Sequence, residues 1–120
     1  LIGAYCHMFD MQAWAFRFAN VVGARQTHGV AYDFIRKLRA DPRRLRVLGD
    51  GTQSKSYVHV SDIVAGVTHI VQATSARFDA FNLATDDYID VTTIARLVAA
   101  AMGLDDLQGN SQSIQVSDDV

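Results

Sequence analysis

The chain has 120 residues, a single cysteine and a formal net charge of −2, with 49% hydrophobic and 20% charged residues. This length and balance predict one soluble globular domain with its own core. No apolar run approaches the roughly 20 residues that a membrane span needs, so we expect no membrane partner. Cys6 alone excludes an internal disulfide and fits a reducing compartment, for which we expect the cytoplasm. The four histidines lack the spacing of metal ligands, so no metal site is expected.

The first forty residues predict a helix, a strand and a second helix. Helical spacing over Leu1 to Asp10 indicates the last turns of an amphipathic helix, and the start on Leu1 suggests a missing upstream part. Alternation over Ala13 to Ala19 predicts a strand with aromatic residues on one face and mostly alanines on the other, as in strands covered on both sides. We expect Asn20 to His28 to form a loop and Gly29 to Arg39 to form a helix that ends before proline.

The stretch from Leu45 to Asp62 predicts a strand, a glycine loop, a second strand and a helix start. Gly49-Asp50-Gly51 is a strong turn signal between the apolar run Leu45 to Leu48 and the β-prone run Tyr57 to Val60. Ser61-Asp62 has side chains suited to capping a helix. The expected glycine hairpin carries Lys55 at the edge of an α/β unit, where its charge could hold an anionic ligand.

The remainder predicts helices over Asp62 to Thr74 and Val91 to Met102, with a strand over Asp79 to Ala84 between them. From Gln108 to Val120 the pattern gives way to polar residues, which predicts a poorly ordered tail. Helices that alternate with short strands predict an α/β fold with some parallel pairing. Three or four strands are few for a free-standing sheet of this kind, a second indication of a missing part.

For several candidate sites, a structural explanation is stronger than a functional one. Six cations between Arg36 and Arg46 could contact nucleic acid, but they fall on a helix end, so we expect a solvated surface and no nucleic-acid partner. Gly49 to Ser54 begins like a dinucleotide fingerprint, yet its third glycine is replaced by Ser54 and it leads to a strand, so that interpretation is rejected. Cys6 and His7 are neighbours on a helix and do not face each other. His59 is interpreted as a core or interface histidine.

A binding group remains. Asn20, at the end of the first strand, could offer an amide donor at the edge where ligands bind open α/β sheets. Lys55 offers a point charge suited to phosphate, and Tyr57 could stack or hydrogen-bond. A turn-forming asparagine and an exposed loop lysine are equally compatible with this spacing.

Three motifs, in order and spacing, resemble the extended short-chain dehydrogenase/reductase family. They run from Arg17 to Gly23, from Gly49 to Asp62 and from Phe81 to Ala84, and the resemblance covers about residues 1 to 104. Its closest branch is the NAD-dependent epimerase/dehydratase group, which includes UDP-glucose 4-epimerase. The resemblance implies a partial Rossmann-like fragment, with the last core strand and the substrate-binding lobe in residues 1–107 and the tail in 108–120. The family's glycine fingerprint and catalytic Tyr-x-x-x-Lys do not occur in the sequence.

The resemblance also implies roles for individual residues. Phe18 would lie near the nicotinamide of NAD, and Asn20 would contact the diphosphate of a nucleotide sugar. Lys55 stands where the family usually has an arginine, so it keeps the charge but loses the bidentate geometry. Tyr57, proposed above from its own chemistry and not from the resemblance, is also expected to contact the substrate. Positions around the nucleotide base and sugar match Val30, Arg46 and Leu48.

The resemblance thus implies the nucleotide-sugar-binding portion of an epimerase or dehydratase. The parent would use NAD, could be a homodimer, and would oxidise a sugar hydroxyl transiently. We expect no catalytic residue in these 120 residues and no turnover by them alone. The alternative is a non-catalytic α/β binding or assembly module that pairs through its aromatic strand.

Overall fold

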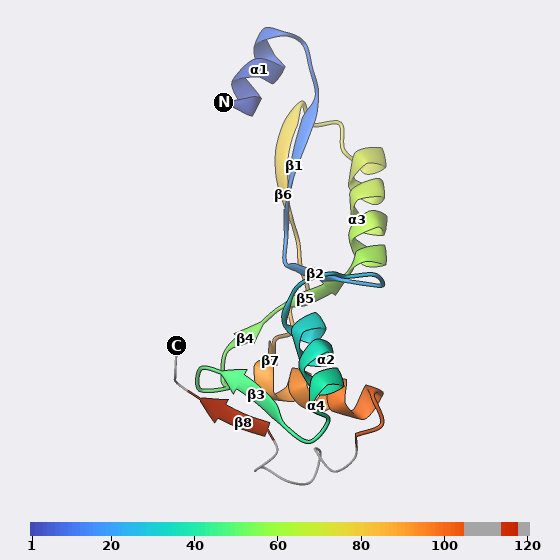
Figure 1. Ribbon diagram of the computed structural model, residues 1–120. Coiled ribbons are helices and arrows are strands. Elements are labelled where there is room, and N and C mark those ends of the chain that lie inside the picture. The colour runs from blue at the N-terminus through green and yellow to red at the C-terminus, as the bar shows by residue number, and fades with distance from the viewer. Residues whose placement is uncertain (105–113, 118–120) are drawn as a thin grey trace. The chain divides into compact units, whose positions relative to one another are not determined.

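The computed structural model describes residues 1–104 and 114–117, and it shows helices and strands in alternation (Figure 1). The chain divides into two compact units. Unit 1 comprises Leu1–Gly23 and Ser56–Asp87, and unit 2 comprises Ala24–Lys55 and Tyr88–Val120. Three of the strand pairs are parallel, so the predicted α/β class with parallel pairing is confirmed.

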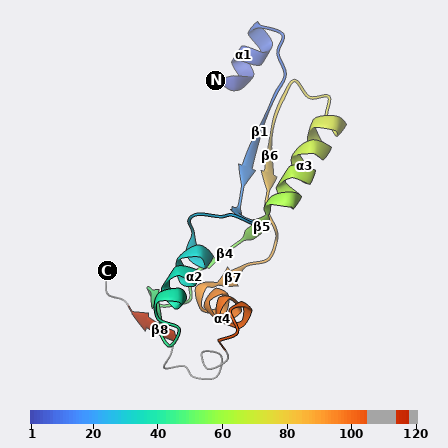
Figure 2. The same cartoon turned by 45° about the vertical axis from the view of Figure 1, so that its right-hand side comes forward.

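Unit 1 is built on two parallel strand pairs, β1 with β6 and β2 with β5. Its elements are α1 (Ile2–Met8), β1 (Ala13–Phe18), β2 (Asn20–Val22), β5 (Tyr57–His59), α3 (Val60–Ala73) and β6 (Phe78–Leu83). Both views show α3 running alongside β1 and β6 (Figures 1 and 2). A Cβ built on Gly66 of α3 would lie 3.0 Å from Leu83 Cδ2, so glycine allows the helix to approach β6 closely.

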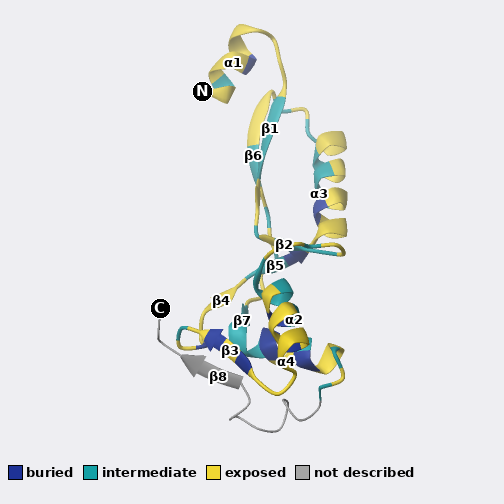
Figure 3. Ribbon diagram, viewed as in Figure 1, coloured by how far each residue is buried: buried dark blue, intermediate teal, exposed yellow. Residues whose placement is uncertain are grey.

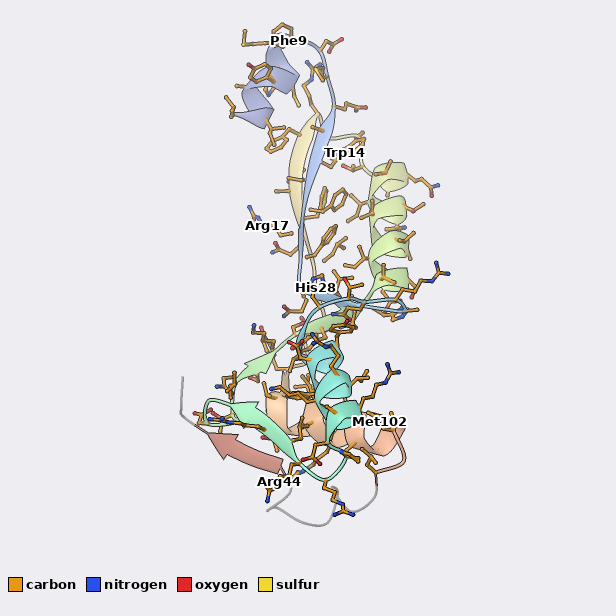
Figure 4. All side chains as sticks on the ribbon, viewed as in Figure 1. Phe9, Trp14, Arg17, His28, Arg44 and Met102 are labelled. Atoms are coloured by element: carbon orange, nitrogen blue, oxygen red, sulfur yellow. The ribbon has the colours of Figure 1, made fainter. Side chains whose placement is uncertain are left out.

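The aromatic face of β1 packs as its alternation predicts. The Trp14 indole nitrogen donates to the Ala76 carbonyl at 3.2 Å, and the rings of Phe16 and Phe81 stack at 5.9 Å between centroids. Figure 4 shows Trp14 on the side of β1 that faces α3 and Arg17 on the opposite side. The strand therefore has one face covered by α3, while Arg17 projects from the other.

Unit 2 pairs two helices with short strands. Its elements are α2 (Val30–Ala40), β3 (Leu45–Leu48), β4 (Ser54–Lys55), β7 (Ile89–Asp90), α4 (Val91–Ala101) and β8 (Ile114–Ser117). Buried positions gather on α2, β3 and α4 (Figure 3). Leu38, Leu45 and Val47 are 1%, 0% and 0% exposed, which gives this unit a closed core. The small buried side chains of Ala95 and Ala99 let α4 come close to α2.

Three sequence predictions need correction. Asn20–Val22 forms strand β2 instead of a loop, because it pairs with β5, a partner 35 residues or more away that local sequence does not reveal. The predicted glycine hairpin is wrong: β3 pairs with β8, while β5 pairs with β2. Helix α3 begins at Val60, with His59 as its N-cap, and not at Asp62.

The predicted tail from Gln108 to Val120 includes one described element. Ile114–Ser117 forms strand β8 in parallel register with β3, so part of that segment is regular structure. The rest of the predicted tail lies outside the described residues.

Two features do not occur among the described residues. None of their helices combines the length and the apolar character needed to cross a bilayer. Among the same residues, no cluster of three or more His, Cys, Asp or Glu side chains could hold a metal ion.

Candidate functional site

The seven residues predicted to bind substrate or cofactor fall in both units. Phe18, Asn20 and Tyr57 belong to unit 1, and the other four, Val30, Arg46, Leu48 and Lys55, belong to unit 2. Asn20 and Lys55, the pair expected to hold a diphosphate, are therefore in different units.

In unit 1 the structure brings Asn20 and Tyr57 together. They are register partners in the parallel pairing of β2 with β5. The backbone nitrogen of Asn20 donates to the Ser56 carbonyl at 3.3 Å, and its side-chain Nδ2 donates to the same oxygen at 3.0 Å. One of the two N–H bonds of this amide is thereby engaged by β5. Because the residue is exposed, the amide oxygen and the second N–H can meet a ligand.

Phe18 is the last residue of β1 and is 51% exposed. Its ring stacks on that of Phe16 with centroids 6.5 Å apart. It pairs in register with Leu83, the last residue of the parallel strand β6. An aromatic ring thus stands at the carboxyl ends of two parallel strands, the edge at which ligands bind in open α/β sheets.

In unit 2, Arg46 and Leu48 project from the exposed side of β3, since the strand alternates between buried and exposed positions. The backbone carbonyl of Arg46 accepts a hydrogen bond from Lys37 Nζ at 3.1 Å. Val30 is the first residue of α2 and is half-buried.

Lys55 ends the two-residue strand β4 and is exposed. It pairs in antiparallel register with Ile89 of β7. The cation therefore stands on a short paired strand, and not on the free loop that the sequence predicted.

The loop before Lys55 is held in a defined conformation. Gly49 and Gly51 have φ angles of +83° and +77°, in the left-handed region that favours glycine. The Asp50 carboxylate accepts from the Thr52 backbone nitrogen at 2.8 Å, and bonds from Thr52 hold the pKa of Asp50 below its ordinary value. Thr92 Oγ1 donates to the Gly51 carbonyl at 3.0 Å. The bond from Thr92 connects the loop to the start of α4.

Other sequence candidates have structural roles. Cys6 is buried and His7 is exposed, so these neighbours occupy different environments. His59 is exposed, so the core half of the expectation of a core or interface histidine is wrong, while an interface role stays a prediction. Its ring accepts from the Ser61 backbone nitrogen at 3.3 Å. The six cations from Arg36 to Arg46 are all exposed, as a solvated helix end would be.

The sequence did not single out Ser56 or Thr85. Their hydroxyl oxygens lie 2.9 Å apart, and that of Thr85 also donates to the Tyr57 carbonyl in β5. Hydroxyl residues in loops are common, so only the position of Thr85, two residues after β6, could have drawn attention to it.

Comparisons with known proteins give the family context. Residues 1–84 match the NAD dependent epimerase/dehydratase family. Over all 120 residues the chain is 24% identical to an uncharacterized UDP-glucose epimerase of Bacillus subtilis, of which it covers 36%. Over 59 residues, 49% of this chain and 18% of the relative, it is 27% identical to dTDP-4-dehydro-6-deoxy-D-allose reductase of Streptomyces bikiniensis.

Solved structures agree with that match. A crystal structure of UDP-galactose 4-epimerase has 36% sequence identity and a TM-score of 0.76, over 98% of this chain and 37% of that one. UDP-glucose 4-epimerase of Thermotoga maritima, solved with UDP-glucose, has a TM-score of 0.72 at 22% identity, over 99% of this chain and 37% of that one. The chain thus spans little more than a third of these relatives' length. The predicted family resemblance and the predicted partial Rossmann-like fold are confirmed.

Proposed function

The chain belongs to the NAD-dependent epimerase/dehydratase family, and on this premise we propose that it is the nucleotide-sugar-binding portion of a sugar-nucleotide epimerase or dehydratase. The observation that carries the proposal is the parallel register of β2 with β5. This register sets Asn20, an exposed amide, beside Tyr57. Both belong to the motifs on which the resemblance depends.

Each candidate residue has a proposed role. In unit 1, Asn20 donates a hydrogen bond to the diphosphate and Tyr57 contacts the substrate. In unit 2, Lys55 supplies positive charge to a phosphate. Nucleotide base and sugar are contacted by residues of unit 2, namely Val30, Arg46 and Leu48. Lysine provides charge without the planar fork of arginine. Binding here therefore depends more on electrostatic attraction, which salt screens, than on bidentate hydrogen bonding.

NAD is the cofactor proposed for the parent enzyme. It supplies a hydride acceptor that later returns the hydride to the sugar. The residues present fit only a part of such a site: Phe18 offers an exposed ring at the carboxyl edge of β1. The sequence contains no Gly-x-Gly-x-x-Gly and no Tyr-x-x-x-Lys. We therefore propose that the purified 120 residues bind a nucleotide sugar without turning it over.

The test is calorimetric titration of UDP-glucose into the purified chain at low salt. Lys55→Met is expected to weaken binding about tenfold or more, because a hydrogen bond to a charged group is worth about 1.5–3 kcal/mol. Arg96→Met is the matched control, since it removes another exposed cation of unit 2. Asn20→Ala is expected to weaken binding about two- to tenfold. Equal affinities for wild type, Lys55→Met and Asn20→Ala would contradict the proposed roles, and turnover by the chain alone would contradict the proposed inactivity.

A second candidate function is supported by the apolar side chains that unit 1 exposes. Met8, Phe9 and Val64 are 74%, 59% and 60% exposed. An assembly module would use exposed apolar side chains of this kind to bind another chain. Sedimentation velocity distinguishes the two functions: a concentration-dependent oligomer that ignores UDP-glucose favours assembly, and a monomer that binds UDP-glucose favours the substrate-binding portion.

A further inference from the structure

Four oxygen atoms of unit 1, two from hydroxyl groups and two from backbone carbonyls, form a compact network beside β5. Thr85 Oγ1 donates to the Tyr57 carbonyl at 3.1 Å and lies 2.9 Å from Ser56 Oγ. Ser56 Oγ also donates to the Thr85 carbonyl at 3.0 Å. All three contacts are partly buried and join segments 28 or 29 residues apart in sequence. The segment after β6 is therefore attached to the residues that open β5.

The network holds β5 on the side opposite to β2. Successive carbonyls of an extended strand point to opposite sides. The Ser56 carbonyl accepts from the backbone nitrogen and the side-chain Nδ2 of Asn20, on the β2 side. The next carbonyl, that of Tyr57, has Thr85 Oγ1 as its donor. The start of β5 is thus bonded to Asn20 on one side and to Thr85 on the other.

Counting the protons of the network shows that Thr85 Oγ1 is the atom whose removal would disturb the backbone of β5 most. Two hydroxyl groups supply two protons for three contacts. If the Thr85 proton goes to the Tyr57 carbonyl, the Ser56 proton is left to serve both oxygens of Thr85. Removing Thr85 Oγ1 would leave the Tyr57 carbonyl without this donor, and an unsatisfied, partly buried carbonyl is costly. The backbone of Ser56 and Tyr57 would then shift, and Asn20 is bonded to that backbone.

We propose that Thr85 is a positioning residue for nucleotide-sugar binding, which it supports by holding β5 so that Asn20 and Tyr57 keep their geometry. This inference rests on the proposed function, which assigns Asn20 and Tyr57 to the substrate. Thr85 acts through Ser56 and the β5 backbone and does not itself contact the ligand.

The first test observes Asn20 in the free chain by NMR. Thr85→Val removes the hydroxyl at nearly constant shape, and it is expected to speed hydrogen exchange of the Asn20 backbone and side-chain amides about three- to tenfold. Thr85→Ser keeps the donor and should restore slow exchange. Thr68→Val is the matched control, because it removes a hydroxyl that donates to Val64 O at 2.8 Å within α3 of the same unit. Unchanged Asn20 exchange in Thr85→Val, or an equal change in Thr68→Val, would overturn the proposal.

Ser56→Ala provides a second variant in case Thr85→Val does not fold. It removes both Ser56 hydroxyl contacts and leaves the bond from Thr85 to Tyr57. A smaller increase in Asn20 exchange than the one expected for Thr85→Val supports the proposal, and no increase counts against it.

The second test measures UDP binding by calorimetry. Thr85→Val is expected to weaken binding about three- to tenfold, Thr85→Ser to restore it, and Thr68→Val to leave it unchanged. If wild type binds no UDP, the proposed function fails while the Asn20 exchange still decides whether Thr85 positions this residue. If wild type and Thr85→Val bind UDP equally, the positioning role fails and the proposed function stands.

Discussion

The two units differ in how many of their apolar side chains are buried. Among the described residues, seven of the ten buried apolar side chains lie in unit 2, and eleven of the fourteen exposed large apolar side chains lie in unit 1. Unit 1 is built on parallel strand pairs, and parallel sheets in α/β proteins are normally covered on both faces. Its β1 and β6 have α3 along one face. Unit 2 therefore has its own core. Unit 1 exposes apolar side chains, as a layer does that needs a further layer packed against it.

This contrast fits the proposed function. The chain spans 36% to 37% of the Bacillus relative and of the solved 4-epimerases. A binding portion cut from a longer enzyme would retain a complete core where its own segments pack together, and it would expose apolar surface where the rest of the enzyme packs. We expect unit 1 to open more readily than unit 2, because regions with few buried apolar contacts open at lower free energy.

The largest expected effect tests the core of unit 2. Leu38→Ala removes a side chain that is 1% exposed and should lower the free energy of unfolding by about 2–5 kcal/mol. Leu97→Ala on α4 is the matched control, because Leu97 is 57% exposed and its loss should cost less than about 0.5 kcal/mol. Urea unfolding gives the totals, and hydrogen exchange shows where protection is lost. Equal loss of protection in both units would mean that the division into units has no energetic counterpart.

The next prediction concerns the packing at the start of α3 in unit 1. A Cβ on Gly23 would lie 2.7 Å from Val60 Cγ1, and the branched Val60 side chain has few rotamers to escape into. Gly23→Ala should therefore destabilise the chain by about 1–3 kcal/mol. Val60→Ala in the same chain should recover most of that loss, a coupling measurable in a double-mutant cycle by urea unfolding. Additive effects of the two substitutions would show that unit 1 is packed too loosely for positions 23 and 60 to be energetically coupled.

The sequence could reveal the longer helices and strands but not the shortest strands or their pairing. Helices α2, α3 and α4 and strands β1, β3 and β6 were predicted to within two residues, because their apolar periodicity is local. Strands β2, β4, β7 and β8 are two to four residues long and owe their existence to distant partners, so no local pattern reveals them. The sequence indicated Asn20 and Tyr57 as site residues. Their pairing and the Thr85 network depend on contacts between segments at least 28 residues apart in sequence, which no local pattern reveals.

Helix α3 supplies the third prediction, through its cap. His59 accepts from the Ser61 backbone nitrogen through Nδ1 and so satisfies a free N–H of the first turn. His59→Ala should cost about 1 kcal/mol and should speed exchange of the first-turn amides of α3, while His59→Asn keeps an acceptor and should cost less. His69→Ala, which changes an exposed residue inside the same helix, is the control. If His59→Asn costs as much as His59→Ala, then capping is not the role of this side chain.

The smallest expected effect is the pH dependence of the corresponding cap in unit 2. The Asp90 carboxylate accepts from the Thr93 backbone nitrogen at 2.6 Å and from Thr93 Oγ1 at 3.0 Å, and these bonds lower the pKa of Asp90. A carboxyl whose pKa is lower in the folded state stabilises it fully above the unfolded value, near 3.9, and loses that contribution as the pH falls through the folded value. The urea midpoint of wild type should therefore fall more than that of Asp90→Asn between pH 6 and about pH 2. Asp50, whose pKa is also lowered, remains in both proteins and provides a shared background. Parallel curves would show that the Asp90 cap contributes no measurable acid sensitivity to the fold of unit 2.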